Sequence, residues 1–411
     1  MRPIEEQVAI IMQGTEYGDE ETRRSMEQEL RQRLHAAAAA NRPLRVYCGF
    51  DPTTSDLHLG HTVPLFKLRQ FQDLGHDVTF LIGSFTSTIG DPSDKDKLRP
   101  QLQLETTLAN AATYAEQAFV VLDRAKTTIK YNHTWLSELS FSDVINLASN
   151  FTVQQFLTRE NFKLRLENGE PIYLHEFFYA LMQGYDAVAL ETDVQVGGTD
   201  QLFNIVTAGR KLQTAHEQPP QVAVILDILP GTDGELKMSK STGNHIPIKS
   251  APEDMYGKVM SLPDHVMPMF FKLVTRYEPP QVAEVVAAWE SGTRHPRDVK
   301  MELARAIVSF FHGAEAAQAA EAHFVQVFQR KELPDEMPSY AIAGETSLVD
   351  VIFDAGIIPS KGQIRRLIKQ GGVRLDGEKV TDTYLNLHPL PEQIVQVGKR
   401  HFLRVTGTDG Q

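Results

Sequence analysis

The sequence predicts an α/β fold built on a doubly wound, parallel, Rossmann-like sheet. Apolar residues alternate with others over residues 44–50, a pattern typical of a strand. A helical segment over residues 60–74 follows and Gly75 caps it, after which residues 78–84 form a second apolar run. Strand, helix and strand in this order are the unit of a parallel sheet. The turn after the first strand therefore lies at the edge where such sheets bind ligands.

The rest of the chain predicts further parts around this sheet. Residues 4–40 have the composition of a helical segment, which Pro43 ends. A mostly helical insertion then interrupts the sheet pattern. The predicted sheet domain covers residues 1–249, with the insertion at about 98–170 and later apolar runs at 187–198 and 221–230. An all-α domain over residues 250–331, a linker over 332–345 and a small α/β module over 346–411 are predicted to follow.

The composition is that of an ordinary globular protein with more than one domain. Of 411 residues, 42% are apolar and 23% are charged. The single cysteine suits a reducing compartment, and the N-terminal segment lacks the pattern of a signal or transit peptide. No stretch approaches the roughly 20 apolar residues that a membrane span needs. We therefore expect a cytoplasmic protein with no membrane partner.

Charge is distributed unevenly along the chain. The net charge is −12, but residues 348–411 hold nine Lys and Arg against seven Asp and Glu, so this segment carries +2. Within it, Lys361, Arg365 and Lys369 recur at helical spacing and form a cationic stripe. Such a stripe is typical either of a solvated helix or of an RNA-binding surface, and the uneven charge favours RNA.

Two short motifs predict a phosphate site. His58, Gly60 and His61 lie where the first strand gives way to a helix, and the free N–H groups of a helix start favour phosphate. Lys237 and Lys240 lie on a loop of the type that can clamp a polyphosphate. Alone, the histidines could be a solvated cap and the lysines an ordinary cationic loop. Structural zinc is disfavoured because the chain has no second cysteine.

Three polar groups accompany these motifs. Tyr179, Gln183 and Asp186 fall on one face of a predicted helix and offer a phenol, an amide and a carboxylate to a polar ligand. A partly solvated helix face is the alternative. Residues 197–201 end a predicted strand with glycines that permit close backbone approach, and residues 90–95 form a turn of uncertain role.

Taken together, the motifs resemble those of bacterial tyrosyl-tRNA synthetases, which are class I aminoacyl-tRNA synthetases. The resemblance covers essentially the whole chain, and its tail is similar to an RNA-binding module of a ribosomal small-subunit protein. The matching segments are Y-C-G-F-D-P-T with H-L-G-H, G-D-P-S-D-K, Y-x-x-x-Q-x-x-D, Q-V-G-G-T-D-Q and K-M-S-K-S. Asp94 and Pro64 depart from the family pattern, which bears on how strongly ATP is held.

The resemblance implies roles for individual residues. Tyr47 and Asp186 would hold the phenol of tyrosine, and Tyr179, Gln183 and Asp91 its ammonium group, with Asn132 as a further tyrosine contact and Gln201 beside the reacting carboxylate and α-phosphate. Catalysis would rest on His58, His61, Lys95, Lys237 and Lys240, of which the lysines reach the pyrophosphate. ATP would also contact Cys48, Gly49, Asp51, Thr53, Gly60, Gly198 and Asp200, and RNA would contact Lys361, Arg365 and Lys369.

The resemblance also implies the reaction and its partners. Tyrosine and ATP, with Mg²⁺ as the nucleotide's ion, would form tyrosyl-adenylate, which then charges tRNA(Tyr). No structural metal is expected, and the insertion would help to form a homodimer. Three alternatives remain: a tryptophanyl enzyme, an inactive RNA-binding relative, and a small-molecule adenylyltransferase. Tyr47 and the cationic tail favour tyrosine over tryptophan, the intact histidines and lysines argue against an inactive relative, and the helical and RNA-binding parts argue against the adenylyltransferase.

Overall fold

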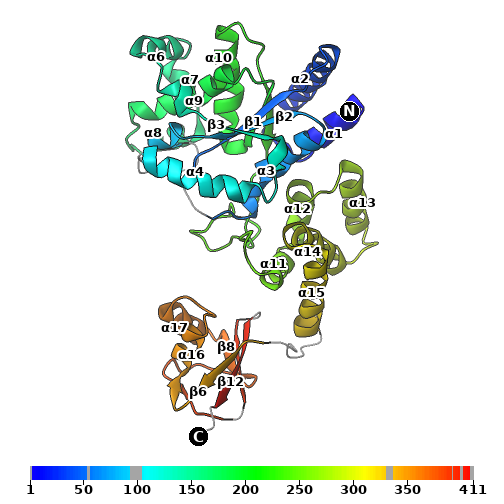
Figure 1. Cartoon of the computed structure of the whole chain (residues 1–411), viewed down its shortest axis with the longest axis vertical. Coiled ribbons are helices and arrows are strands. Elements are labelled where there is room, and N and C mark those ends of the chain that lie inside the picture. The colour runs from blue at the N-terminus through cyan, green and yellow to red at the C-terminus, as the bar shows by residue number, and fades with distance from the viewer. Residues whose placement is uncertain are drawn as a thin grey trace. The chain divides into compact units, whose positions relative to one another are not determined.

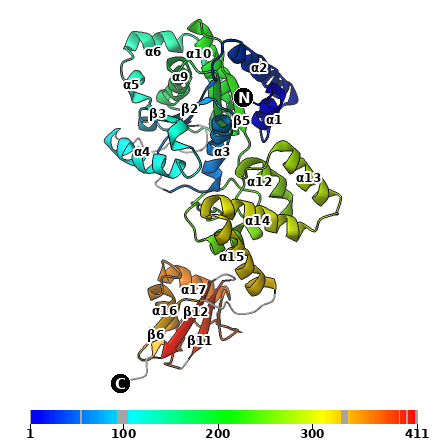
Figure 2. The same ribbon diagram turned by 45° about the vertical axis from the view of Figure 1, so that its right-hand side comes forward.

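The computed structural model describes residues 2–52, 56–92, 104–329, 337–390, 392–398 and 401–407. The chain divides into two compact units, one of residues 1–250 and 258–313 and the other of residues 251–257 and 314–411. In the first unit, α1 (Ile4–Met12) and α2 (Glu20–Ala39) lie together, away from α6 (Phe141–Ala148) (Figures 1 and 2).

The first unit contains the predicted parallel sheet. Its five strands are all parallel, with β1 at the centre. In spatial order they are β3 (Thr127–Tyr131), β2 (Asp77–Ile82), β1 (Arg45–Phe50), β4 (Val194–Gly198) and β5 (Val222–Leu226). The doubly wound fold class is therefore confirmed.

Helices cover both faces of this sheet. On one face, Tyr47 of β1 packs against Ala187 of α9 (Leu174–Ala189). On the other, the Phe50 ring stacks on Phe80 with 4.5 Å between centroids, and Tyr114 of α4 (Leu104–Ala118) lies 5.9 Å from Phe50. Since neighbouring residues of a strand point to opposite faces, α4 and α9 enclose the central strands between them.

The first unit contains several more helices of α or π type. The helix α3 (Leu59–Asp73) follows β1 and packs on β1, β2 and β4. The others are α5 (His133–Leu136), α6 (Phe141–Ala148), α7 (Val153–Leu157), α8 (Glu160–Glu167), a π-helix (Phe203–Gly209), α10 (Arg210–Ala215), α12 (Met267–Val274), α13 (Pro279–Glu290) and α14 (Pro296–His312).

The structure differs from the sequence prediction at several elements. The predicted helical segment over residues 4–40 is two helices, because Gly14 and Gly18 take positive φ angles of 76° and 82° between them. The insertion, predicted to be mostly helical, contains β3, a strand of the main sheet. The fourth strand begins at Val194 because Ala187 still belongs to α9.

The second unit ends in a small module with its own core. Its mixed sheet has β6 (Ser339–Ile342), β12 (His401–Gly407), β11 (Gln393–Val397), β8 (Val373–Leu375) and β9 (Glu378–Lys379) in spatial order, and β10 (Asn386–Leu387) pairs with β7 (Thr346–Ser347). The unit's helices are α15 (Ala314–Phe324), followed by a π-helix (Val325–Gln329), α16 (Leu348–Asp354) and α17 (Lys361–Lys369), while α11 (Pro252–Met260) begins in it.

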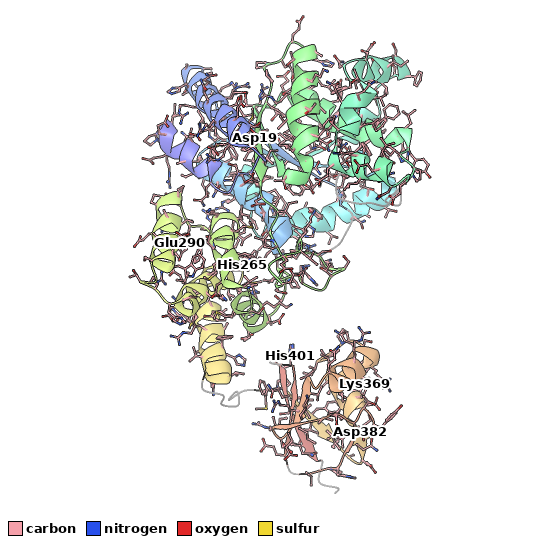
Figure 3. All side chains as sticks on the ribbon, turned by 180° about the vertical axis from the view of Figure 1, so that it is seen from behind. Asp19, His265, Glu290, Lys369, Asp382 and His401 are labelled. Atoms are coloured by element: carbon pink, nitrogen blue, oxygen red, sulfur yellow. The ribbon has the colours of Figure 1, made fainter. Side chains whose placement is uncertain are left out.

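The module matches the predicted α/β unit, with one correction. Its core draws all its members from residues 342–405. Asp376 and Gly377 take φ angles of 50° and 86° between β8 and β9, which is the predicted tight turn. The described part of the predicted linker, however, contains β6, which pairs in parallel with β12. Figure 3 marks Lys369, Asp382 and His401 on this module.

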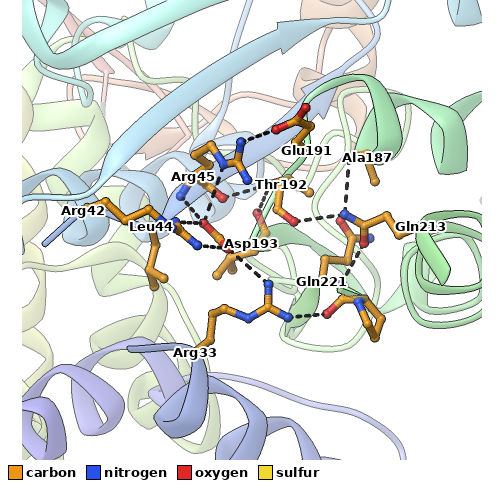
Figure 4. A network of polar contacts seen from close by, with 12 residues as sticks. Arg33, Arg42, Leu44, Arg45, Ala187, Glu191, Thr192, Asp193, Gln213 and Gln221 are labelled. Carbon is orange, nitrogen blue, oxygen red and sulfur yellow. Dashed lines mark hydrogen bonds and ion pairs between the residues drawn. The ribbon is translucent and has the colours of Figure 1, made fainter. Parts of the chain in front are cut away.

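A buried carboxylate joins the sheet to the N-terminal helices (Figure 4). The Asp193 side chain is 2% exposed and accepts bonds from Arg42 Nη1 at 2.6 Å, Arg33 Nη1 at 3.1 Å and the Arg45 backbone N at 2.9 Å. Burial alone raises the pKa of Asp193, but these bonds outweigh it and hold that pKa below its ordinary value. The carboxylate is thus charged and paired at neutral pH.

No helix among the described residues is long and apolar enough to cross a membrane.

We expect Asp193→Ala to destabilise the first unit, because it leaves two guanidinium groups without their acceptor. Breaking one side of a buried ion pair costs about 3–5 kcal/mol, and the partial exposure of Arg42 places the loss near the lower end. Differential scanning calorimetry of the unfolding transition of the first unit measures this loss of stability. The matched control is Glu191→Ala, whose pair with Arg45 is exposed on both sides and contributes at most about 1 kcal/mol.

The direction in which pH changes the stabilisation by Asp193 follows from its depressed pKa. A carboxyl whose folded pKa is depressed stabilises the fold above its unfolded pKa of about 3.9 and loses that contribution as pH falls through the folded pKa. The difference in unfolding free energy between wild type and Asp193→Ala is therefore largest at neutral pH and becomes smaller in acid. Equal melting temperatures for Asp193→Ala and Glu191→Ala at pH 7 would contradict this role for Asp193.

Candidate active site

The candidate site lies where β1 and β4 end side by side. The two strands pair in parallel at Val46 with Val194 and at Tyr47 with Gln195, so their carboxyl ends share one edge. Asp51 follows β1, and the turn Thr199–Gln201 follows β4. On one side of this junction the strand order runs to β2 and β3, and on the other to β5. Ligands of doubly wound sheets bind at such a reversal.

Two buried groups on opposite elements define a candidate polar pocket. Tyr47 on β1 is 1% exposed, and its hydroxyl has no hydrogen-bond partner among the described residues. Asp186 on α9 is 3% exposed, and it accepts bonds from Trp135 Nε1 at 2.8 Å and Asn132 Nδ2 at 3.2 Å. A buried hydroxyl without a partner costs about 1–3 kcal/mol, so the pocket is suited to a ligand that supplies one.

The electrostatics of this pocket favour neutral groups. Burial raises the pKa of Asp186 to about 8, although the bonds from Trp135 and Asn132 act in the opposite direction. Burial, and then the Asp186 charge, raise the pKa of Tyr47 well above its ordinary value. At neutral pH the pocket therefore offers a carboxyl group and a phenol that can each exchange a hydrogen bond with a hydroxyl.

A second network connects this pocket to the end of β1. The Tyr179 hydroxyl donates to Asp51 Oδ2 at 3.0 Å, and Thr86 Oγ1 donates to Asp51 Oδ1 at 2.8 Å. Asn132 Nδ2 in turn donates to Thr86 Oγ1 at 3.2 Å. A Cβ at Gly83 would lie 1.9 Å from Asp51 Oδ1, so the carboxylate fits only because this position is glycine.

A third network joins the turn after β4 to α9. Gln201 Nε2 donates to Asp91 Oδ2 at 2.7 Å. Asn204 Nδ2 donates to Gln201 Oε1 at 3.0 Å and to Gln183 Oε1 at 2.9 Å. Asn204 is fully buried. It fixes two of the predicted site residues relative to each other.

The two histidines lie together at the start of α3. His58 is the N-cap residue, its ring centroid is 3.7 Å from that of His61, and the His58 backbone N–H donates to His61 Nδ1 at 3.2 Å. Burial lowers the pKa of His58 to about 2 and that of His61 to about 4, with further lowering from neighbouring imidazole and lysine charges. Both rings are therefore neutral at pH 7 and can donate one N–H each to an anion.

The lysine loop, residues 231–244, faces these histidines. The segment after it pairs with the start of α3, since Leu59 N–H donates to the Ile246 carbonyl at 3.0 Å. A Cβ at Gly60 would lie 3.1 Å from the His58 ring and 3.4 Å from Met238 Cβ, so Gly60 gives room to the loop as well as to a ligand. Ion pairs hold the two lysines in this form: Lys237 to Asp200 at 3.3 Å and Lys240 to Asp56 at 3.8 Å.

The residues predicted to bind tyrosine and ATP thus gather at one edge of the sheet, with two exceptions. Thr53 and Lys95 lie outside the described residues. Cys48 and Gly49 are on β1 and Gly198 ends β4. Burial raises the pKa of the Cys48 thiol, which excludes a thiolate there at neutral pH.

Four residues that complete these networks were not predicted from the sequence: Gly83, Thr86, Trp135 and Asn204. Two of them follow β2, so the residues after the second predicted strand could have been searched because parallel strands end at a common edge. Trp135 follows β3, which was not recognised as a strand.

The predicted cationic stripe lies on α17 in the second unit. Arg365 and Lys369 are exposed, while Ile364 and Ile368 are fully buried on the other side of the helix. Lys361 pairs with Asp350 at 2.8 Å, so it is less available than the other two. The helix therefore presents a basic face outward, as its spacing predicted.

Comparisons with known proteins agree with this geometry. Residues 39–329 match the family model of class I tRNA synthetases for tryptophan and tyrosine. Residues 329–404 match the model of the C-terminal domain of tyrosine–tRNA ligases. The two matches together span the sheet, the helical region and the C-terminal module.

Curated relatives and solved structures extend the match. A tyrosine–tRNA ligase of Moorella thermoacetica is 50% identical over 380 residues, which is 92% of each chain. That of Desulfotalea psychrophila is 46% identical over 407 residues, 98% of this chain and 99% of its own. The tyrosyl-tRNA synthetase of Archaeoglobus fulgidus, solved with L-tyrosine, shares the fold with a TM-score of 0.59 at 22% identity over 78% of this chain and all of its own. The chain therefore belongs to the tyrosine–tRNA ligases, a family of class I aminoacyl-tRNA synthetase enzymes.

Proposed function

We propose that this protein activates L-tyrosine with ATP, releases pyrophosphate, and transfers the tyrosyl group from tyrosyl-adenylate to the 3′ end of tRNA(Tyr). One observation carries the choice of amino acid. The Tyr47 hydroxyl and the Asp186 carboxyl are buried on facing elements, and the hydroxyl has no partner in the part of the chain that the structure describes. A substrate phenol would supply that partner and bond the carboxyl at the same time.

The same pocket would reject phenylalanine. A site built to bond a substrate hydroxyl leaves its own polar groups unpaired when an analogue lacks that hydroxyl. The tyrosyl enzyme is a standard example of this effect, with discrimination of about 10⁵. Tryptophan would offer an N–H to Asp186 but no acceptor for the Tyr47 hydroxyl, because an indole nitrogen only donates.

The other polar networks would bind the main-chain end of the substrate. We propose that Tyr179, Gln183 and Asp91 contact the ammonium group, and that Gln201 lies by the reacting carboxylate. Support comes from the bond between Gln201 and Asp91 and from Asn204, which joins Gln201 to Gln183. Asn132 would act on the phenol through Asp186, to which it donates.

Activation would proceed by positioning and charge stabilisation. The tyrosine carboxylate attacks the α-phosphate of ATP, which enters as its magnesium complex, and pyrophosphate leaves. His58 and His61 would donate neutral N–H groups to the phosphates at the start of α3, where the helix dipole also favours an anion. Lys237 and Lys240 would exchange their aspartate partners for the departing pyrophosphate. Lys95 is proposed to assist them.

The remaining nucleotide contacts would come from the strand ends. Asp51 and Thr53 would face ATP, and the ribose and adenine would lie against the backbone and side chains that end β1 and β4: Cys48, Gly49, Gly60, Gly198 and Asp200. A thiol that stays neutral suits this position because it adds no charge next to the nucleotide.

We propose a division of labour along the chain. Residues 1–249 would carry activation, residues 250–331 would contact tRNA, and residues 346–411 would bind RNA through Lys361, Arg365 and Lys369. The basic outer face of α17 and the self-contained core of the module support the last assignment. We expect the enzyme to act in the cytoplasm.

We also propose a symmetric homodimer formed by the inserted helices. Large apolar side chains in the insertion and in the helix that follows it are exposed, including Phe141 at 80% and Leu174 at 69%. They lie on α6 and α9, which contact each other. A second copy would cover these side chains, since isolated monomers rarely expose such clusters.

The first prediction concerns the amino acid. Among all twenty, tyrosine alone should support strong ATP–pyrophosphate exchange, because only its side chain satisfies both Tyr47 and Asp186. Purified protein and labelled pyrophosphate suffice for the measurement. Equal or faster exchange with tryptophan would overturn the assignment.

The second prediction concerns the phosphate site. His61→Ala or Lys240→Ala should slow adenylate formation by about 10²–10³-fold and change the tyrosine dissociation constant little, because both groups act on charge that develops during the reaction. Stopped-flow measurement of single-turnover activation separates the two constants. Glu138→Ala, an exposed change outside the site, serves as the control. A variant that mainly weakened tyrosine binding would place these residues elsewhere.

The third prediction concerns the C-terminal module. A chain ending at residue 331 should still form tyrosyl-adenylate but charge tRNA(Tyr) poorly, because it lacks the outward basic face of α17. In the full chain, replacing Lys361, Arg365 and Lys369 by alanine should reduce the salt slope of tRNA binding by about two to three. Arg24→Ala is the control for lost charge elsewhere. Undiminished charging by the shortened chain at ordinary salt would exclude the module as an RNA-binding site.

A further inference from the structure

The conformation of the lysine loop depends on one buried amide. Asn244 ends the loop, is 6% exposed, and folds back across it. Its side-chain Oδ1 accepts bonds from the Ser239 backbone N at 2.8 Å and from Thr242 Oγ1 at 2.7 Å. Its backbone carbonyl accepts from Thr232 N at 2.8 Å. These bonds tie the segment between the two lysines to the loop's end.

The other half of the same amide holds the segment that carries Lys237. Asn244 Nδ2 donates to Asp233 Oδ2 at 2.6 Å and to the carbonyl oxygens of Leu236 and Lys237, each at 3.3 Å. Asp233 Oδ1 accepts from the Leu236 backbone N at 2.9 Å. The side chain thus contacts the backbone on both sides of Met238, which is itself buried.

Only a side-chain amide can make both sets of bonds. Asparagine presents an acceptor oxygen and a donor NH₂ group on the same carbon, whereas aspartate at this position would present only acceptors to Asp233 and to two carbonyls. The site is also shaped for it. A Cβ at Gly231 would lie 2.1 Å from Asn244 Cγ, so a side chain at residue 231 would displace the amide.

We propose that Asn244 is a positioning residue, which holds the backbone of residues 236–239 so that Lys237 and Lys240 reach the polyphosphate as charge develops on it. The inference rests on the proposed function of the lysines. Asn244 itself touches no reacting atom. In the present form the same backbone directs the two ammonium groups to Asp200 and Asp56, the carboxylates that phosphate oxygens would replace.

The expected kinetic signature follows from this role. Misplacing catalytic groups by about 1 Å can cost about 100-fold in rate, whereas tyrosine binds to groups on β1 and α9 that Asn244 does not contact. Asn244→Ala should therefore slow adenylate formation by about 10–100-fold, slow the reverse reaction with pyrophosphate similarly, and leave the tyrosine dissociation constant within about twofold.

The experiment compares six variants with wild type in single-turnover activation, pyrophosphorolysis and tyrosine binding. Gly231→Ala should reproduce the Asn244→Ala defect, and the double variant should lose little more, because both changes remove the same amide from its place. Asn244→Asp should be as slow as Asn244→Ala, and adding Asp233→Asn should recover part of the rate by restoring a donor opposite the carboxylate. Glu235→Ala, an exposed change in the same loop, should behave as wild type.

Each outcome of this experiment either supports or contradicts a stated claim. Wild type without tyrosine-dependent exchange would overturn the proposed function. Active wild type with an unchanged rate in Asn244→Ala would overturn the inference alone. A merely structural role predicts that tyrosine binding and thermal stability fall together with the rate, that the Asn244→Ala and Gly231→Ala losses add, and that the reversed pair gives no recovery. Any of these results would also contradict the positioning role.

Discussion

The placement of β1 between β2 and β4 is the constraint on which the site depends. Tyr47 lies within β1, Asp51 lies just past its end, and His58 starts the helix that follows. Parallel pairing with β4 brings the turn at residues 199–201, distant in sequence, to the same edge. A shift of one residue in this register would turn Tyr47 away from Asp186 and toward the opposite face.

At this edge of the sheet, polar side chains either form hydrogen bonds with one another or are placed to bond a ligand. Asp186, Asp51 and Asp91 each accept bonds from neighbouring side chains, whereas the Tyr47 hydroxyl bonds to none of the residues described. The histidines stay neutral because they are buried near lysines. In the proposed function, selectivity and phosphate binding have the same physical origin, since the ligand would supply the hydrogen bonds and the charge.

Much of the fold and of the candidate site could be predicted from the sequence. The alternation in β1, the glycine after α3 and the i, i+4, i+7 spacing of Tyr179, Gln183 and Asp186 each report local geometry directly. The elements that could not be predicted depend on contacts with residues that are distant in the sequence. β3 has a polar, half-exposed pattern at the sheet edge, so its neighbours Asn132 and Trp135 could not be placed by periodicity. Residues 337–345 read as a linker because β6 gains its stability only from pairing with β12, some 60 residues later.

The central claim is that the Tyr47 hydroxyl bonds the phenol of the substrate. Equilibrium binding of tyrosine and phenylalanine to wild type and Tyr47→Phe tests it most directly, because the four dissociation constants isolate the interaction between two hydroxyl groups. The account predicts that Tyr47→Phe weakens tyrosine binding by up to about tenfold, the value of one hydrogen bond, and leaves phenylalanine binding unchanged or tighter. Equal losses for both amino acids would contradict it, since the substitution would then act on the pocket and not on the phenol.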